Sequence, residues 1–469
     1  MSTLYFVLIP LLASFLTPFF KEYLKYISVA INVMLLTLAL SFISKLPITE
    51  YISFDSPLSI SFVLDEASLF FIVLFTTIMT LFSIYNLQSI NDKKSHPKEM
   101  FILTNMLLAS VSGLVLSGDI FNIYIFFEIA SITAYILTSL NRDKKAYSGA
   151  IRYMIMGTVA SLFLLIGIMS IYINIGSLNL ITISEKFATI DEDIQFLILL
   201  SLFIGFGIKV EIFPLNLWVV DIYQATNSKI NALFSSVLSK AYIFLFFHIA
   251  YILNVDNDKL LFLASIGVVS FMVSEISAVS SKDVKRVFAY STLGQIGLLF
   301  IAFAHQDTRV VTGAIFLIAL HALTKLMLFL SFDILEQQLK STKIEIFKAF
   351  NSPFLVVIFV VGFLSLLGLP PFGGFIAKLT ILKGLASLES YTMIGFILAI
   401  SLIEALYLFK LLGVMIESKK EAKAIEIELL PKIILALIAT AILYFGLFPE
   451  SLLSISQSVA TTLIGETGV

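Results

Sequence analysis

The sequence has no cysteine among its 469 residues and only four histidines. Disulfide bonds, cysteine-ligated iron–sulfur clusters and thiolate metal sites are therefore excluded, and so few histidines are a poor supply of haem or metal ligands. The chain also lacks a P-loop and a dinucleotide-binding glycine fingerprint. We expect this chain to bind no cofactor and no metal.

Charge is scarce as well. Charged residues make up 13% of the chain and hydrophobic residues 59%, with a mean hydropathy of +1.01. A soluble domain could not bury this much apolar surface, and a net charge of −2 gives no general attraction to nucleic acid. The composition predicts an all-α polytopic membrane protein.

Long apolar stretches are abundant. A membrane-spanning helix needs about 20 mainly apolar residues, and the first stretch lacks the basic segment and cleavage site of a removed signal. We therefore interpret it as a spanning helix. About fourteen stretches qualify by hydropathy: residues 3–20, 26–44, 66–88, 100–118, 121–140, 150–174, 195–219, 230–254, 260–280, 286–305, 308–335, 353–386, 391–416 and 433–455.

The basic residues predict an orientation. Of the 30 lysines and arginines, 19 lie in loops after odd-numbered stretches, five lie after even-numbered ones and six lie within stretches. Cytoplasmic loops carry the basic excess. The odd loops are therefore predicted to be cytoplasmic, and both termini extracytoplasmic, for a multi-pass protein of the cell (inner) membrane.

Two stretches are predicted to be broken helices. The first, GFGIKVEIFPLNLW, carries Gly205, Gly207 and Pro214, and the second, GLPPFGGFIAK, covers residues 368–378. Unwound backbone at membrane depth persists only where protein or water satisfies its polar groups. Paired breaks in two halves of a chain favour inverted repeats around an ion site, and a simple packing kink is the alternative.

Titratable side chains lie inside the apolar stretches. Each costs at least ~2.5–3.5 kcal/mol in hydrocarbon, so such groups usually face a polar pathway. A buried lysine can alternate between charged and neutral as a carboxylate partner moves, which arginine cannot do. The row predicts a path for protons, and snorkelling is the alternative for any single lysine. Its members are Glu128, Lys209, Lys240, His321, Lys325 and Lys378.

His321 and Lys325 are four residues apart and therefore share one helix face. Histidine titrates near neutrality and suits proton transfer between lysines; the alternative is a hydrogen-bonded core histidine. Glu404 is the most membrane-embedded of the other acids, either as an exit group or as a partner of Lys410. The further carboxylates that could extend or end the path are Glu211, Asp221, Glu275, Asp333 and Glu404.

These motifs resemble one family. It contains the antiporter-like subunits of respiratory complex I, of Mrp-type Na+/H+ antiporters (the D-type subunit) and of membrane-bound hydrogenases. The resemblance covers residues 60–415 and rests on the Asp119–Glu128 stretch and on GIKVEIFPLNLWVVDIY, ALFSSVLSK, SKDVKRVFAYSTLGQIG, HALTKLMLFL and GLPPFGGFIAK.

The resemblance implies two half-channels, each a five-helix unit, related by inversion. Glu128 would pair with Lys209, Lys240 would pass protons to His321, and Lys378 would release them. The long lateral helix of some complex I paralogues is expected to be absent. The implied division is helices 1–3 in residues 1–99, a first repeat in 100–255, an inverted repeat in 256–416 and a last helix in 417–469.

The sequence also departs from the family pattern. Asn216 replaces a usual histidine and Lys229 a usual proline, which weakens a relay through that loop. Glu211 beside Lys209 is unexpected, and it either tunes the lysine or points elsewhere.

The sequence thus predicts a proton-translocating subunit, with the coupling ion, H+ alone or Na+/H+ exchange, left open. Its expected partners are lipid and the other membrane subunits of an Mrp, hydrogenase or complex I-like (NADH dehydrogenase-like) assembly. Redox cofactors would lie in those partners, so enzymatic function of the assembly stays open. The alternatives are a stand-alone secondary transporter for a solute and a non-conducting structural subunit.

Overall fold

The computed structural model describes residues 2–16, 23–52, 60–88, 96–417 and 422–465. The chain divides into two compact units. Unit 1 is Met1–Glu211, Val237–Asp256 and Gly465–Val469, and unit 2 is Ile212–Ser236 and Asn257–Ile464. Residues 17–20 of the first predicted stretch and five of the loop lysines lie outside the described residues: Lys21, Lys93, Lys94, Lys419 and Lys420.

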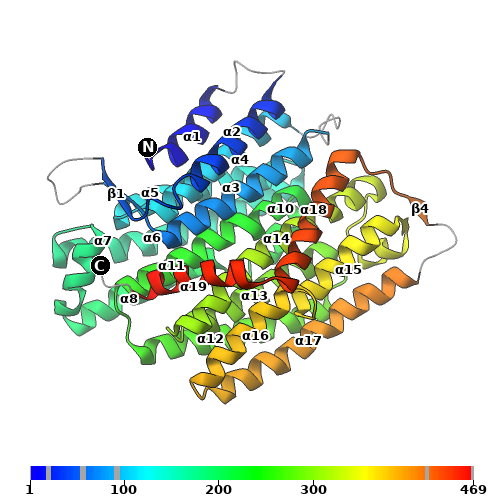
Figure 1. The fold of residues 1–469 in the computed structure, drawn as a ribbon. Coiled ribbons are helices and arrows are strands. Elements are labelled where there is room, and N and C mark those ends of the chain that lie inside the picture. The colour runs from blue at the N-terminus through cyan, green and yellow to red at the C-terminus, as the bar shows by residue number, and fades with distance from the viewer. Residues whose placement is uncertain (1, 17–22, 53–59, 89–95, 418–421, 466–469) are drawn as a thin grey trace. The chain divides into compact units, whose positions relative to one another are not determined.

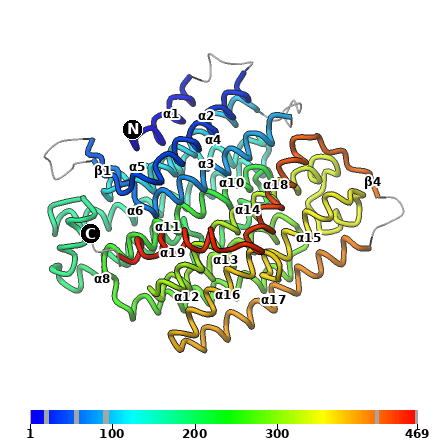
Figure 2. Tube along the Cα trace, viewed as in Figure 1, coloured from blue at the N-terminus to red at the C-terminus, as the bar shows by residue number. Residues whose placement is uncertain are grey.

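Unit 1 is built from helices and one short hairpin. The strands β1 (Ile48–Tyr51) and β2 (Ser61–Leu64) pair antiparallel. Helices α1 to α4 pack side by side (Figure 2). The helices of unit 1 are α1 (Tyr5–Leu16), α2 (Leu24–Leu40), α3 (Glu66–Asn86), α4 (Pro97–Leu116), α5 (Ile120–Ser139), α6 (Lys144–Ile175), α7 (Leu180–Lys186), the 3-10 turn η3 (Phe187–Thr189), α8 (Glu192–Val210) and α11 (Ser239–Ile252).

Unit 2 packs around one long buried helix, α14. Helices α10, α15, α16, α18 and α19 all contact α14, and α17 lies alongside α12 and α16 (Figure 1). The elements are α9 (Val219–Ala225), α10 (Ser228–Leu233), α12 (Asn257–Ser280), α13 (Val284–Phe303), α14 (Thr308–Leu339), η5 (Ile344–Lys348), β3 (Phe350–Asn351), α15 (Pro353–Leu367), α16 (Gly373–Ser387), α17 (Tyr391–Ile416), β4 (Lys423–Ala424), α18 (Leu429–Leu447) and α19 (Glu450–Ile464). A π-helical turn, η4 (Phe234–Leu238), links α10 to α11 along the chain.

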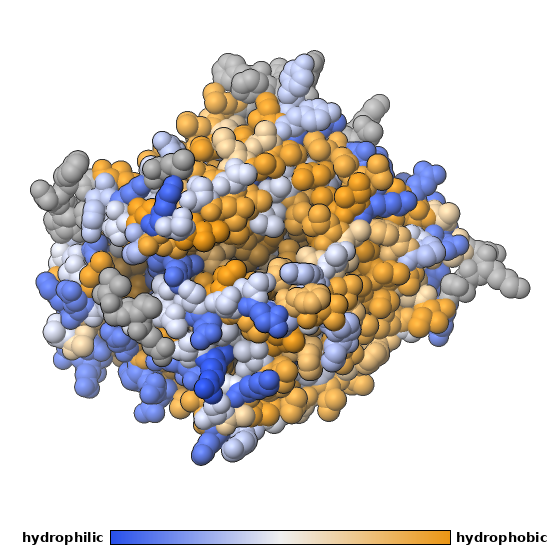
Figure 3. Space-filling model, viewed as in Figure 1, coloured by the Kyte–Doolittle hydropathy of each residue, from blue (hydrophilic) through white to orange (hydrophobic). Residues whose placement is uncertain are grey.

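The predicted fold class is confirmed. Among the described residues, 11 helices are long and apolar enough to cross a membrane when Ser228–Ile252 is counted as one, and three shorter apolar helices accompany them. Exposed leucines and isoleucines on α17, such as Leu402 and Ile416 at 71% and 81% exposure, are the side chains expected to face lipid. Apolar residues also cover broad areas of the face in Figure 3.

Aspartates start several of the helices. The Asp119 carboxylate accepts the Asn122 backbone N–H at 2.7 Å, and Asp143 accepts that of Ala146 at 2.8 Å. Such N-caps satisfy donors that the first helical turn leaves free. They explain why α5 and α6 begin where they do.

Both predicted helix breaks are present. α8 ends at Val210, Glu211 follows with a left-handed φ of 68°, and the next helix begins only at Val219. In unit 2, α15 ends at Leu367, Gly368 takes a φ of 77°, and α16 begins at Gly373. Glycine adopts that conformation without strain, whereas a glutamate there is uncommon.

Candidate proton pathway

Lys209 lies in the last turn of α8 and is 2% exposed. Its Nζ donates to the Tyr135 hydroxyl at 3.1 Å. The ammonium also faces the rings of Tyr153, Tyr135 and Phe127, with centroids at 4.7, 4.8 and 5.5 Å. Aromatic faces attract a cation, so this cage stabilises the charged lysine inside unit 1.

Glu128 lies near Lys209 without touching it. It is half-buried on α5 and accepts a hydrogen bond from the Ser161 hydroxyl of α6. Among the described residues, no carboxylate forms an ion pair within 4.0 Å of the Lys209 ammonium. Glu128 is nevertheless the strongest charge acting on Lys209, with Glu211 second. The implied Glu128–Lys209 pairing is therefore not a direct contact in the part of the chain that the structure describes, and it stays a prediction.

Glu211 interacts electrostatically with two lysines. It lies at the C-cap of α8 and is 7% exposed, and its interaction with Lys240 is stronger than its interaction with Lys209. Lys240 is fully buried near the start of α11, where its Nζ donates to Ser239 Oγ at 3.2 Å. Unit 1 thus holds four coupled groups that alternate in sign, in the order Glu128, Lys209, Glu211 and Lys240.

In unit 2, His321 and Lys325 are buried on α14, at 2% and 0% exposure. The Lys325 ammonium donates to the Phe288 carbonyl oxygen at 2.9 Å and lies 5.8 Å from the Phe288 ring centroid. A carbonyl dipole and a ring face stabilise the cation, although neither provides a counter-charge.

Lys378 meets a carboxylate directly. Its Nζ lies 2.6 Å from Glu404 Oε2 and also donates to the carbonyl oxygen of Leu367, the last residue of α15, at 3.2 Å. Glu404 Oε1 accepts from Gln295 Nε2 at 3.0 Å. Among the described residues, Lys378 and not the exposed Lys410 is the ion-pair partner of Glu404. The role of Glu404 as an exit group stays a prediction.

A second charged cluster lies where α10, α13 and α14 meet. The Lys229 ammonium is 3.6 Å from Asp333, and the Lys285 ammonium is 2.6 Å from Glu336. Ser228 Oγ also donates to Glu336, at 2.5 Å. Lys229, where the family usually has proline, therefore has a carboxylate partner on α14.

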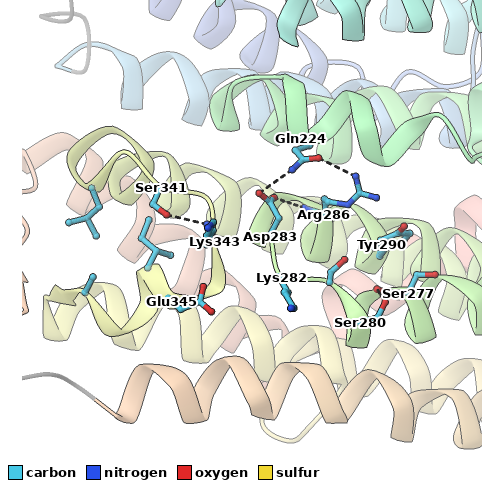
Figure 4. Close-up of a pocket in the computed structure, with 14 residues that line it drawn as sticks. Gln224, Ser277, Ser280, Lys282, Asp283, Arg286, Tyr290, Ser341, Lys343 and Glu345 are labelled. Atoms are coloured by element: carbon cyan, nitrogen blue, oxygen red, sulfur yellow. Dashed lines mark hydrogen bonds between the residues drawn. The ribbon is translucent and has the colours of Figure 1, made fainter.

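A pocket of ≈ 940 Å³ lies beside this cluster, at the ends of α12 and α14 and the start of α13. Figure 4 shows Gln224 between Asp283 and Arg286, with hydrogen bonds to both, while Ser277, Ser280 and Tyr290 lie at one end of the pocket. Arg286 also binds Asp221 at 2.9 Å. Most of the lining residues are polar or charged, with both signs present, which suits entry of water.

Sequence reasoning missed several polar partners. Tyr135 and Ser161 bind the first lysine and glutamate of the row, and Gln295 and Tyr407 surround Glu404. A glutamine in the apolar run STLGQIGLLF was a usable signal. Single tyrosines and serines in apolar helices carry no such signal, because they are common there.

The chain matches a family model described as "NADH:quinone oxidoreductase/Mrp antiporter, TM" over residues 117–404. This chain belongs to that family. The match contains the whole titratable row from Glu128 to Lys378 and also Glu404, so the resemblance noted in the sequence is confirmed.

Individual relatives agree with this membership. The chain is 28% identical to a putative antiporter subunit mnhD2 of Staphylococcus haemolyticus, over 94% of this chain and 91% of that protein. It is also 28% identical to the NADH-quinone oxidoreductase subunit N of Desulforudis audaxviator, but that match covers 65% of this chain and 62% of the relative.

A solved structure extends the similarity to nearly the whole fold. A chain of the membrane-bound sulfane sulfur reductase, an archaeal respiratory membrane complex, superposes with a TM-score of 0.92 at 26% identity. The superposition covers 98% of this chain and 97% of that one. This family member therefore has the fold of a membrane subunit from a multisubunit complex.

Proposed function

We propose that this chain is a proton-translocating subunit of a multisubunit membrane assembly of the Mrp, hydrogenase or complex I type. The observation that carries the proposal is the set of buried, mutually coupled acids and lysines in each unit. Keeping one ionisable group in hydrocarbon costs at least ~2.5–3.5 kcal/mol. We infer that a chain that retains this many buried ionisable groups, with partners of opposite charge, uses them to move protons.

In unit 1 the alternating signs provide the mechanism. Two charges ~4 Å apart interact by about 4 kcal/mol at an effective dielectric of 20, and the groups of unit 1, which lie farther apart, interact less strongly in proportion to their distance. When a neighbouring subunit changes the charge near Glu128, the field on Lys209 changes, and its proton moves toward Glu211 and Lys240. The aromatic cage favours the charged form of Lys209 and so resets the lysine after each transfer.

In unit 2 the broken helix supports proton release. Lys378 contacts both Glu404 and the Leu367 carbonyl oxygen at the end of α15. Unwound helix ends of this kind bind ions in transporters. Protons would reach Lys378 from the buried pair His321 and Lys325. The lysine can hold its proton against Glu404 or release it when that carboxylate is neutralised.

The basic loops support a direction for proton transport. The pocket near Lys285 and Arg286 lies among loops that carry the basic excess, which is the cytoplasmic side under the positive-inside rule. Protons would enter there, and both termini would lie on the opposite side. We also propose that the chain divides after residues 99, 255 and 416 and that its two middle segments are inverted five-helix repeats.

Proton uptake by membrane vesicles tests the function. With the native partner subunits present, Lys209→Ala and Lys378→Ala should each abolish translocation while the assembled complex persists. Lys383→Ala is the matched control, because this exposed lysine lies five residues further along α16. Wild-type rates in either buried-lysine variant contradict the proposal.

The same vesicles separate the alternatives. Full activity after neutralising the whole row favours a structural subunit. Solute uptake by vesicles that contain this chain alone favours a stand-alone transporter.

A further inference from the structure

Gly446 on helix α18 packs directly against the helix break that precedes Lys378. A Cβ atom at this position of α18 would lie 2.0 Å from the Pro371 carbonyl oxygen, 2.6 Å from the Phe372 carbonyl carbon and 2.7 Å from the Gly373 backbone nitrogen. All three atoms are backbone atoms, and they belong to the end of the break and the first residue of α16. Only a residue without a side chain permits this approach.

The segment that α18 contacts has no room to move aside. On the α14 side, a Cβ at Gly373 would lie 2.6 Å from Leu320 Cδ1. On the α15 side, a Cβ at Gly374 would lie 1.9 Å from the Ser365 carbonyl oxygen. Helices α14, α15 and α18 all contact α16 and enclose its start. Because packed interiors have few voids, a displacement of one wall passes to the enclosed segment.

The enclosed segment carries the lysine of the buried ion pair. Lys378 follows Gly373 by five residues on α16. Its ammonium lies 3.2 Å from the Leu367 carbonyl oxygen and 2.6 Å from Glu404. These two partners belong to other helices, α15 and α17. A shift of the start of α16 therefore changes both distances at once.

We propose that Gly446 is a positioning residue: α18 fixes the start of α16 and thereby holds Lys378 against Glu404. Helix α18 (Leu429–Leu447) lies outside residues 117–404, the part of the chain that the family model matches. The inference thus adds a helix from beyond the matched region to the Lys378 site. It rests on the proposed function, in which Lys378 releases protons.

An alanine at Gly446 adds a methyl group to a closed contact. Carbon and oxygen atoms in favourable contact lie about 3.3–3.6 Å apart, so the break or α18 has to move by about 1 Å. A misplacement of about 1 Å can lower the rate of a positioned reaction about a hundredfold. With the native partner subunits present, we expect Gly446→Ala to lower proton translocation in vesicles at least about tenfold.

Two controls separate positioning from a general packing defect. Gly395→Ala, on the same helix as Glu404, adds a Cβ with nothing within 4 Å and should behave like the wild type. Gly267→Ala closes another tight contact of unit 2, where the added Cβ of α12 would lie 2.8 Å from the Gly297 carbonyl oxygen of α13. It should lower the unfolding midpoint but leave most of the translocation rate.

A double-variant cycle tests whether Gly446 acts through the ion pair. Two changes that act through one shared contact have non-additive effects, whereas the fold-changes of independent defects multiply. In a Glu404→Gln background, Gly446→Ala should therefore lower the remaining rate by no more than about twofold. Gly267→Ala should change the rate by the same factor in both backgrounds.

Hydrogen–deuterium exchange of the purified full-length chain gives a readout that does not depend on transport. Backbone amides of residues 368–378 should exchange at least about tenfold faster in Gly446→Ala, because a displaced segment opens more readily. Gly395→Ala and Gly267→Ala should leave this exchange unchanged. Gly373→Ala meets the flexible end of Leu320, so it displaces the same segment more mildly and replaces Gly446→Ala in the test if that variant does not fold.

Three results overturn the inference: wild-type translocation in Gly446→Ala, fold-changes that multiply in the cycle with Glu404→Gln, or unchanged exchange of residues 368–378. Failure of the proposed function gives a different pattern. Faster exchange together with a wild-type rate in Lys378→Ala means that α18 positions this lysine but that the lysine carries no protons. If Lys378→Ala is inactive while Gly446→Ala behaves like the wild type, the proposed function stands and the positioning role fails.

Discussion

The ammonium of Lys378 on α16 and the carboxylate of Glu404 on α17 lie 2.6 Å apart, and both side chains are buried. The same lysine also contacts the last carbonyl of α15. The helix break after α15, Lys378 and Glu404 are therefore joined by direct contacts. Because opposite charges in a buried pair interact strongly, replacing either residue leaves the other without its partner.

The first prediction concerns Glu404. Glu404→Gln keeps the side-chain shape but removes the counter-charge of Lys378, so the lysine should release its proton too early. We expect proton translocation in vesicles to fall at least about tenfold, the ratio given by 1.4 kcal/mol. Lys410→Gln, on the same helix but exposed, should behave like the wild type. A loss in the Lys410 variant alone would reverse the assignment.

The second prediction separates charge from proton exchange at Lys209. Lys209→Arg keeps a positive charge inside the aromatic cage, but arginine does not give up its proton. Translocation should therefore be as low in Lys209→Arg as in Lys209→Ala, with both proteins assembled. An active arginine variant, measured by the same vesicle assay, would mean that Lys209 provides a fixed charge.

The third prediction concerns the buried Lys229–Asp333 pair. Asp333→Leu leaves the Lys229 charge buried without this carboxylate, and breaking a buried pair costs about 3–5 kcal/mol. The midpoint of thermal unfolding, measured in detergent at a fixed scan rate, should drop clearly. The double variant Lys229→Met/Asp333→Leu should recover most of the loss, because neither charge of this pair remains.

The control for this pair is Glu345→Gln, an exposed acid on η5. Surface substitutions of this kind usually change stability by no more than ~0.5 kcal/mol. A double variant as unstable as the single Asp333→Leu would show that packing, and not the ion pair, explains the loss.

The fourth prediction concerns Asp119, which lies between two spans. Burial raises the pKa of this carboxyl above its ordinary 3.8, despite backbone hydrogen bonds that favour the charged form. The folded state therefore binds the proton more tightly than the unfolded chain does. Stability contributed by Asp119 should fall as pH rises from 3.8 through the folded pKa.

Asp119→Asn removes this titration and keeps a good N-cap, whereas Asp119→Ala also loses the cap, at ~1 kcal/mol. Unfolding midpoints measured against pH should show the wild type losing stability relative to Asp119→Asn as the pH rises. The Asp119→Ala variant should be less stable than Asp119→Asn at every pH. Parallel curves for wild type and Asp119→Asn would contradict the burial argument.

Local sequence determined the class of this protein. Three local features of the sequence act without distant residues. Apolar runs near 20 residues form spanning helices, glycine and proline break two of them, and lysines within hydrocarbon require a polar surrounding. The helical membrane fold, both helix breaks and the family followed from them. The roles of the row residues and the inverted repeats stay predictions.

Tertiary structure alone decided which groups meet. Tyr135 and Lys209 are 74 positions apart, and Gln295 and Glu404 are 109 apart. Hydropathy places a residue on a helix, but the rotation of that helix and its neighbours depend on packing over the whole unit. For this reason the aromatic cage of Lys209, the Lys378–Glu404 contact and the carboxylate partner of Lys229 became visible only when the helices were packed together.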